Sequence, residues 1–439
     1  MTTIPSPTTA RLGPLRLAPG VTRGNVIALL VGSFFTSIVS AYLSFAQPYI
    51  LNEHLHLPTE IQGSVSGNLA FFTEIALIAL SGLMGAWSDR IGHRAVFVLG
   101  FLVIGLSYAL YPWATTTAEL YGYRLIYAVG AAAIGAMFVA VQSDYPAEAS
   151  RGLLVACIGV LSILGFMVIV ALLAPLPRRF VAAGFGAVEA GRLAFGVVAV
   201  IAVIGAAVLQ FGLRARVAGE VAQTSLLARL RLGFLVARGN PRIGLAYVAG
   251  LVGRADLAII TIFLSLWITQ VGRAKGLTTQ QALVDAGAVF GVIQLSSLVF
   301  MPILGYVADR IDRVTSLCIA TVIAAVGYVW IGLLAEPVGL QAFPAAIVLG
   351  MGQAGVILTA TALVGQEAPK EALGAVSGVF SISSAIGILV ATSAGGWLFD
   401  AWMPGAPFII MGAANAVVFA IAGAVRLMGQ PRAGSIVQD

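Results

Sequence analysis

The chain has 439 residues, of which 59% are hydrophobic and only 10% are charged, and its formal net charge is +6. Soluble domains carry about 25% charged residues, so this composition cannot cover a globular protein with a water-facing surface. It excludes a water-soluble protein and predicts one that crosses a membrane many times.

Twelve apolar runs follow one another along the chain, each near the length of about 20 residues that a helix needs to cross a bilayer. The alternation over about ten residues that is typical of membrane barrels is missing. We therefore predict an all-α integral membrane protein with twelve transmembrane helices. The expected spans, to within a few residues, are 25–50, 62–87, 95–113, 118–142, 152–174, 191–213, 243–270, 283–308, 314–335, 340–364, 373–398 and 404–426.

The ends of the chain and the basic residues indicate the orientation. Residues 1–24 are rich in Pro and Thr and have no signal-peptide layout, so we expect a disordered cytoplasmic tail, with a second tail at 427–439. Seventeen of the 24 Lys and Arg fall in cytoplasmic segments if both termini lie inside. Cytoplasmic loops carry such an excess, which predicts a multi-pass protein of the inner membrane with both termini cytoplasmic. This orientation accounts for the net positive charge, so the charge does not indicate binding to nucleic acid.

The connection between the second and third spans is unusual. It reads "GAWSDRIGHR", from Gly85 to Arg94, and carries Asp89, Arg90 and His93 between two apolar runs. A simple hairpin loop needs polarity, but it does not need an Asp-Arg pair flanked by glycines. We therefore expect this loop to have a function and a partner.

The longest polar connection, 214–242, divides the chain into two halves, 25–213 and 243–426. Within it, "SLLARLRLGFLVARG" places apolar side chains at helical spacing, with arginines interleaved: Leu226, Leu227, Leu230 and Phe234, and Arg229, Arg231 and Arg238. This pattern predicts a basic amphipathic helix on the inner membrane surface. The alternative is a solvated linker with an early start to the seventh span.

The two halves resemble each other in sequence. "GAWSDRIGHR" recurs as "GYVADRIDRV", 305–314, at a shift of 220 residues (309 minus 89). A second echo, "YPAEASRG" at 145–152 against "APKEALGA" at 368–375, has a shift of 223 (368 minus 145). Two echoes at nearly one offset indicate a duplicated half, with the repeats packed around a central site.

The pattern Gly-x-x-x-Asp-Arg-x-Gly-x-Arg, with twelve spans and a central basic linker, resembles the major facilitator superfamily over nearly the whole chain. The resemblance implies two pseudo-symmetric six-helix bundles that rock about a cavity at the membrane midplane. The chain departs from the drug:proton antiporters of this superfamily at the fifth span. That span, "GLLVACIGVLSILGFMVIVALLAP", lacks their Gly-Pro-x-x-Gly-Gly motif, which speaks against an exporter.

The two echoed loops are predicted to form a gating latch. Gly85 and Gly305 let helices approach closely. Asp89 and Asp309 can reach a basic side chain, or the N-terminus of a helix, in the other half. Such contacts can form in one rocking state and break in the other. The basic members of the predicted latch are Arg90, Arg94, Arg310 and Arg313.

A tight charged turn that only sets the topology is the alternative to a latch. The second copy also departs from the first, with Asp312 in place of Gly92 and Val314 in place of Arg94. The prediction of a latch therefore rests more on the first copy than on the second.

Ionisable side chains inside the spans are candidates for function, because each costs roughly 2.5–3.5 kcal/mol on insertion scales. Glu74 lies near the middle of the second span and is a candidate proton carrier. Arg254 and Asp256 lie near the middle of the seventh span, about 200° apart on a helix, so we do not expect them to pair. An unwound backbone at Gly253 would bring them together instead. We expect at least one of them to act in transport.

Arg124, about two turns into the fourth span, stands where the superfamily often has an arginine. The resemblance implies a role in proton coupling or anion binding, although Ala128 replaces the glycine expected after it. The alternative is a side chain that extends to the outer interface. Trp267 and Gln353 are further candidates for lining the cavity.

These observations predict a monomeric secondary active transporter, proton-linked, for a small organic solute. Arg124 and Arg254 slightly favour an anionic or zwitterionic substrate. Multidrug efflux by proton antiport is the alternative, and a channel or a non-transporting receptor is a remote one. The expected partners of the transporter are the solute, protons and the lipid bilayer.

Enzymatic chemistry is not expected. The three histidines, His54, His56 and His93, all lie in loops. The chain has no His-Glu-x-x-His, no Gly-x-Ser-x-Gly and no nucleotide-binding Gly-x-x-x-x-Gly-Lys-Ser/Thr. We therefore expect no catalytic residues, metal or cofactor.

Overall fold

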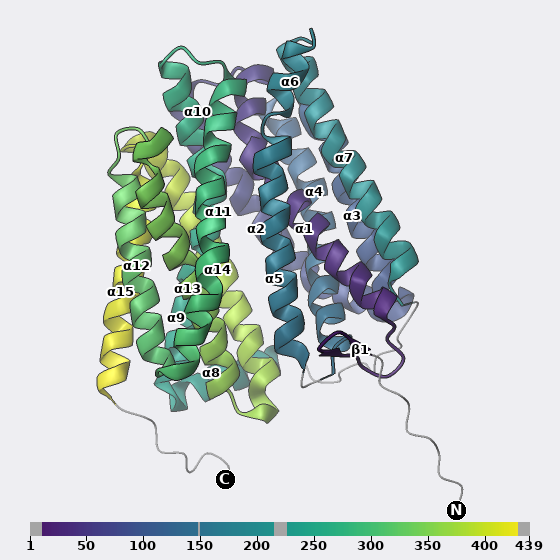
Figure 1. The fold of residues 1–439 in the computed structure, drawn as a ribbon, viewed down its shortest axis with the longest axis vertical. Coiled ribbons are helices and arrows are strands. Elements are labelled where there is room, and N and C mark those ends of the chain that lie inside the picture. Colours follow the sequence, from purple (N-terminus) through teal and green to yellow (C-terminus); the bar gives the residue numbers. More distant parts are fainter. Residues whose placement is uncertain (1–10, 148–149, 215–225, 429–439) are drawn as a thin grey trace, which may run out of the picture. The chain divides into compact units, whose positions relative to one another are not determined.

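Helices account for nearly all of the fold (Figure 1). The computed structural model describes residues 11–147, 150–214 and 226–428. Within these residues, 12 helical segments are long and apolar enough to cross a membrane. The predicted fold class is confirmed: the chain is an all-α, multi-pass membrane protein with twelve transmembrane helices.

Several of the twelve spans continue through short π or 3₁₀ turns. The helices and turns are α1 (Arg23–Tyr49) with η1 (Ile50–His54), α2 (Thr59–Ile91), α3 (His93–Leu110) with η2 (Tyr111–Trp113), α4 (Thr117–Asp144), α5 (Arg151–Val168) with η4 (Ile169–Leu173) and α6 (Leu176–Ala182), α7 (Ala187–Gly212), α9 (Pro241–Ile259) with η5 (Ile260–Leu264) and α10 (Ser265–Ala274), α11 (Thr279–Arg310), α12 (Arg313–Gly332), α13 (Phe343–Glu367), α14 (Leu373–Ala401) and α15 (Ala406–Leu427). A separate helix, α8 (Leu226–Gly239), precedes α9, and the short turns η6 (Gly339–Gln341) and η7 (Lys370–Ala372) precede α13 and α14.

The helices form two compact units. Unit 1 contains the chain up to Leu43, Glu53–Leu55 and the chain from Ile75 to the end of α7. Unit 2 contains Ser44–Asn52, His56–Glu74 and the chain from α8 onward. The second part of α1 and the first half of α2 therefore pack with the helices of the second half of the sequence.

Glycines allow the helices within each unit to touch backbone to backbone. In unit 1, a Cβ atom on Gly130 of α4 would lie 2.7 Å from the carbonyl oxygen of Gly100 in α3. In unit 2, a Cβ atom on Gly387 of α14 would lie 1.9 Å from the carbonyl oxygen of Leu251 in α9. Contacts of this kind replace the hydrophobic effect as the packing force in a lipid environment.

The start of the chain differs from the prediction of a disordered tail. The strands β1 (Arg11–Leu12) and β2 (Leu15–Arg16) form a hairpin, and Leu17 forms a bridge to Pro146 after α4. The amide nitrogen of Ala18 donates to the carbonyl of Tyr145 at 2.9 Å. The expectation is wrong for this segment, because its order comes from a partner distant in sequence. The first ten residues lie outside the described part.

The polar sequence 85–94 is not a loop. α2 continues through Ile91 and α3 begins at His93, so only Gly92 separates the two helices. Gly92 has a φ of 94°, which glycine adopts without the steric cost that other residues bear. The charged residues here mark helix ends rather than a flexible connection.

The predicted helix in the linker is confirmed as α8, although residues 215–225 and the side chains of Leu226, Leu227 and Arg229 lie outside the described part. Gly233 faces α14, where an added Cβ atom would lie 2.7 Å from the carbonyl of Ala375. Phe234 and Leu235 are exposed beside the exposed Arg231 and Arg238. The location of α8 on a membrane surface stays a prediction.

Candidate functional site

Unit 2 brings together two charged residues from the middle of separate spans. Arg254 is exposed, although the span that contains it, Pro241–Ala274, is the most buried of the twelve. An unpaired guanidinium is costly in lipid, which makes Arg254 a candidate for lining a polar space inside the protein. Glu74 of α2 is half-buried, and the positive charge of Arg254 acts on its carboxylate.

The two side chains are close enough to interact but are not locked together. Neither Glu74 nor Arg254 forms a hydrogen bond or ion pair with another residue in the described part of the chain. A carboxylate and a guanidinium in this arrangement can each bind a group of a solute, and the carboxylate can take up a proton.

Asp256 lies on the opposite side of α9 from Arg254. Its side chain is fully buried, and both carboxylate oxygens accept from Nδ2 of Asn415 in α15, at 3.1 and 3.3 Å. The side chain of Tyr328 in α12 interacts with the same carboxylate. α9 stays helical through Gly253, so the alternative of an unwound backbone that joins Arg254 to Asp256 is wrong.

Arg124 lies inside unit 1 among tyrosine rings. The residue is 4% exposed, and its guanidinium lies 5.3 Å from the centre of the Tyr127 ring. Its side chain also hydrogen-bonds to Tyr111, at the end of the third span. The guanidinium is therefore held inside the helix bundle, and the alternative of extension to the interface is not what the structure shows.

The two predicted cavity-lining residues have different environments. Trp267 is buried, with its ring centre 5.8 Å from that of Phe408, so it packs in the core of unit 2. Gln353 of α13 is also buried, but its Oε1 accepts no hydrogen bond from a described residue. Gln294 of α11 has the same property. Sequence reasoning missed Gln294, because one glutamine in an apolar span does not reveal its face.

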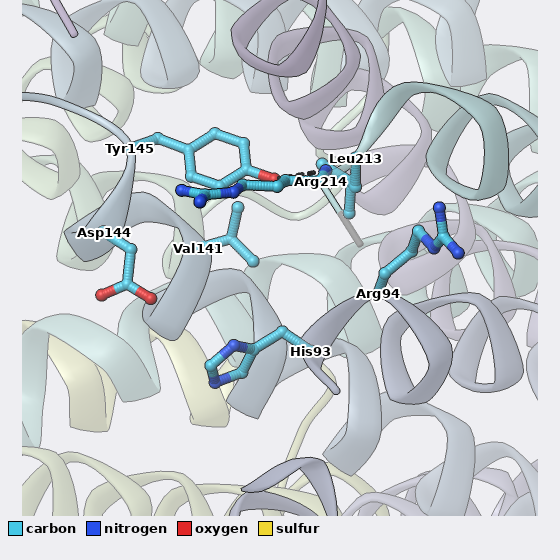
Figure 2. Close-up of a pocket in the computed structure, with 7 residues that line it drawn as sticks. All are labelled: His93, Arg94, Val141, Asp144, Tyr145, Leu213 and Arg214. Carbon is cyan, nitrogen blue, oxygen red and sulfur yellow. Dashed lines mark hydrogen bonds between the residues drawn. The ribbon is translucent and has the colours of Figure 1, made fainter. Parts of the chain in front are cut away.

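The first copy of the predicted latch borders a cavity at one end of unit 1. Asp89 and Arg90 are exposed in the last turn of α2. Arg94 of α3 lies beside a hollow that also includes Asp144 and Tyr145 at the end of α4 (Figure 2). The remaining lining residues in that view are His93, Val141, Leu213 and Arg214.

An adjacent cavity of about 250 Å³ is lined by Tyr145, Arg214 and the segment that follows the N-terminal hairpin. The hydroxyl of Tyr145 accepts from the amide nitrogen of Arg214 at 3.1 Å, and burial raises the pKa of the phenol. The hairpin, the end of α4 and the end of α7 therefore meet at this point of unit 1.

The second copy contains an ion-pair network that sequence reasoning missed. Nη1 of Arg242, at the start of α9, lies 3.0 Å from Oδ1 of Asp312 and 3.1 Å from Oε1 of Glu367. Oδ2 of Asp312 also accepts from the amide nitrogen of Val314 and so caps α12. Asp312, one of the two residues named above as departing from the first copy, thus forms the network. Its position just before a span is a typical capping signal.

The other described residues of the second copy contact neighbours that belong to unit 2, as they do themselves. The guanidinium of Arg310 lies 4.0 Å from the centre of the Tyr306 ring. Nε of Arg313 donates to Oε1 of Gln366 at 3.2 Å. Among the described residues, only the end of Leu358 lies within 4.0 Å of a Cβ atom added to Gly305. The side chain of Asp309 lies outside the described residues.

In the described ranges, no group of three or more His, Cys, Asp or Glu is placed to hold a metal ion. Nδ1 of His54 contacts the carbonyl of Pro112, and Nδ1 of His56 contacts the carbonyl of Asn52, both at 2.9 Å. These histidines interact with backbone atoms at the ends of helices.

Several known proteins are similar to this chain in sequence or in fold. The Major Facilitator Superfamily model matches residues 29–392 and 283–436. The magnetosome protein MamZ of Magnetospirillum gryphiswaldense is 28% identical over 415 residues, which are 92% of this chain and 62% of MamZ. The magnetosome protein MamH of Paramagnetospirillum magneticum is 26% identical over 405 residues, 90% of each chain. This chain thus spans less than two thirds of MamZ but most of MamH.

Two further similarities are a short sequence match and a structure. The class E tetracycline resistance protein of Escherichia coli is 38% identical over 95 residues, 21% of this chain and 23% of that protein. The crystal structure of the nucleoside transporter NupG has a TM-score of 0.69 at 14% identity and covers 91% of this chain and 98% of NupG. At that identity the likeness concerns the fold.

Proposed function

Because the chain belongs to the Major Facilitator Superfamily, a family of secondary transporters, we propose that it moves a small organic solute by proton-linked alternating access. The observation that carries the proposal is that Arg254 is exposed in the middle of the most buried span and that its charge acts on the carboxylate of Glu74. A guanidinium offers a planar, two-pronged contact to a carboxylate or a similar anion. We therefore propose an anionic or zwitterionic substrate.

Glu74 supplies the proposed link to protons. When Glu74 is ionised, its charge competes with a substrate anion for Arg254. Protonation of Glu74 removes that competition, so the binding of a proton favours the binding of the anion. Arg124 and Asp256 are further candidates for coupling, and Asp89 and the other residues of the two echoed segments remain the proposed latch.

The proposed setting is the inner membrane, with both termini cytoplasmic and the protein working as a monomer. The basic excess in the segments on the side of the termini supports this orientation. MamZ and MamH are named as magnetosome proteins, which makes a magnetosome membrane an alternative location. Separation of cell membranes and detection of the tagged chain distinguish the two.

Multidrug efflux by proton antiport is the second candidate function. The match to the tetracycline resistance protein, 38% identical over 95 residues, favours it. The absence of Gly-Pro from the fifth span, 152–174, argues against it. A thermal-shift screen over carboxylates, amino acids, sugars and cationic drugs separates the candidates, because a bound solute raises stability by mass action.

Glu74→Gln is expected to abolish accumulation driven by a pH gradient, because the amide mimics a carboxyl that never releases its proton. Exchange of labelled for unlabelled solute is expected to persist. Both are measured in proteoliposomes with the best solute from the screen. The control is Glu60→Gln, which changes an exposed carboxylate in the first turn of the same helix. If Glu74→Gln accumulates solute as the wild type does, Glu74 is not the proton carrier. If accumulation is lost in Asp256→Asn but not in Glu74→Gln, Asp256 is the coupling site.

Arg254→Lys is expected to weaken solute binding about tenfold or more, because an ammonium loses at least one charge-assisted hydrogen bond to the anion. The melting temperature without solute is expected to change little, since Arg254 forms no ion pair in the described part of the chain. Melting curves with and without solute measure both quantities. Unchanged affinity would remove Arg254 from the binding site.

A further inference from the structure

A fully buried carboxyl group lies where three helices of unit 2 meet. Asp256 of α9, Asn415 of α15 and Tyr328 of α12 are each 0% exposed. α15 packs against both α9 and α12. The carboxyl oxygens of Asp256 lie 3.1 and 3.3 Å from Nδ2 of Asn415, and the side chain of Tyr328 interacts with the same group. These three residues form a polar cluster that neither water nor lipid reaches.

The surroundings of the cluster are apolar. Val252 and Ile260 lie one helical turn on either side of Asp256, and both are buried. The ring of Tyr328 stacks on that of Phe408, with the ring centres 6.4 Å apart. An ionised carboxylate in such surroundings is strongly destabilised unless a cation or several donors replace its hydration shell.

No cation is placed to replace that shell. Asp256 forms no ion pair in the described part of the chain, and Arg254 points to the opposite side of α9. The helices packed around the cluster, α12 to α15, have their charged residues at their ends: Arg313, Glu367, Asp400 and Arg426. The titratable group that faces Asp256 from another helix is the phenol of Tyr328, which is uncharged at neutral pH.

The hydrogen bonds to Asp256 are also too few for an ionised group, because an ionised carboxylate offers about four acceptor positions. Nδ2 of Asn415 has two hydrogens, and the carbonyl of Met411 accepts one of them at 3.0 Å, which leaves one for Asp256. Oδ1 of Asn415 is buried and accepts no hydrogen bond from a described residue. A proton on Asp256 removes the charge and adds a donor to a cluster that contains an acceptor without one.

A second aspartate of unit 2 has the donors that Asp256 lacks. Oδ1 of Asp400 accepts from the amide nitrogen of Gly63 at 2.9 Å, and Oδ2 accepts from that of Ser64 at 2.6 Å. Both amides lie near the N-terminus of α2, where the helix dipole favours negative charge. Asp400 is also only half-buried. Its surroundings suit an ionised carboxylate, so it is a matched comparison for Asp256.

We propose that Asp256, Asn415 and Tyr328 form a proton-binding site, in which Asp256 is a neutral carboxylic acid at neutral pH. The proton neutralises the carboxyl without further ligands, whereas a bound metal cation needs about four to eight donor atoms. The bound proton lets α9 keep a polar link to α12 and α15 in an apolar interior. This inference goes beyond the proposed transport, because the proton is bound with or without a solute.

Infrared spectroscopy of the full chain at neutral pH tests the proposal without a solute. The C=O stretch of a carboxylic acid is separate from the bands of ionised carboxylates, and a detergent without carbonyl groups leaves that region clear. Carboxyl-labelled ¹³C-aspartate displaces the band of an aspartic acid and so distinguishes it from the band of a glutamic acid. We expect a label-sensitive band in the wild type and its loss in Asp256→Asn.

Two further variants are the controls for this measurement. Asp400→Asn is expected to keep the band of the wild type, because Asp400 has the surroundings of an ionised group. Tyr328→Phe is expected to keep the band but to displace it, because the carboxyl loses its phenol neighbour. A wild-type spectrum without a label-sensitive acid band, or an equal loss of the band in Asp400→Asn, would overturn the proposal. If Asp256→Asn does not fold, the displacement in Tyr328→Phe carries the test, and an undisplaced band there would overturn it.

Melting curves in sodium, potassium and choline chloride test a bound metal cation in place of the proton. We expect the same melting temperature for the wild type in all three salts. A higher melting temperature in sodium or potassium that disappears in Asp256→Asn would assign the site to that cation and overturn the proposal. None of these measurements involves solute movement, so their results and those on transport stand or fall separately.

Discussion

Arg242→Ala is expected to lower the free energy of unfolding by about 3 kcal/mol, near the lower end of the range for removing one partner of a buried ion pair. Arg242 has a side chain that is only 7% exposed, and it lies between the carboxylates of Asp312 and Glu367 at 3.0 and 3.1 Å. Its loss leaves two negative groups side by side. Asp312 is 36% exposed, so water relieves part of the cost.

The matched control is Lys275→Ala. Lys275 pairs with Glu336, but the two side chains are 44% and 39% exposed. Exposed pairs contribute about 0–1 kcal/mol, so this variant is expected to unfold almost as the wild type does. Unfolding is followed by circular dichroism in detergent micelles with increasing denaturant. Equal effects of the two substitutions would show that the Arg242 network does not stabilise unit 2.

Gly67→Ala is expected to destabilise the protein by about 1–3 kcal/mol, the usual cost of overpacking. The new methyl group would lie 2.3 Å from the carbonyl oxygen of Thr392, and a backbone atom in a helix cannot move aside alone. Melting curves of the full chain in detergent micelles measure the stability.

Gly82→Ala is the control for this substitution, because it adds the same methyl group to the same helix where no atom of a described residue lies within 4 Å. We expect it to leave the stability unchanged or to raise it slightly through the higher helix propensity of alanine. If Gly67→Ala melts like Gly82→Ala, the close contact between α2 and α14 does not constrain the stability of the protein.

The twelve spans could be predicted because hydropathy over about 20 residues is a local property that the bilayer selects directly. The duplicated segments at 85–94 and 305–314 could also be recognised from the sequence, because a repeat at a constant shift is detected without a structure. The same local patterns indicated that Arg254 and Asp256 would face apart. They did not indicate which of the two would be buried, because that depends on the neighbours of α9.

The sequence by itself determined the membrane-spanning class, the number of spans, the internal repeat and the mid-span charges Glu74, Arg124, Arg254 and Asp256, because each follows from residue type and spacing along one helix. Tertiary structure alone decided that Arg254 lies within reach of Glu74, that Asp312 joins Arg242 and Glu367, and that Asp400 binds the start of α2. Asp400 and Gly63 are separated by 337 residues in the chain. A hydrogen bond between such distant groups depends on helix packing in three dimensions, and no periodicity along the chain records it.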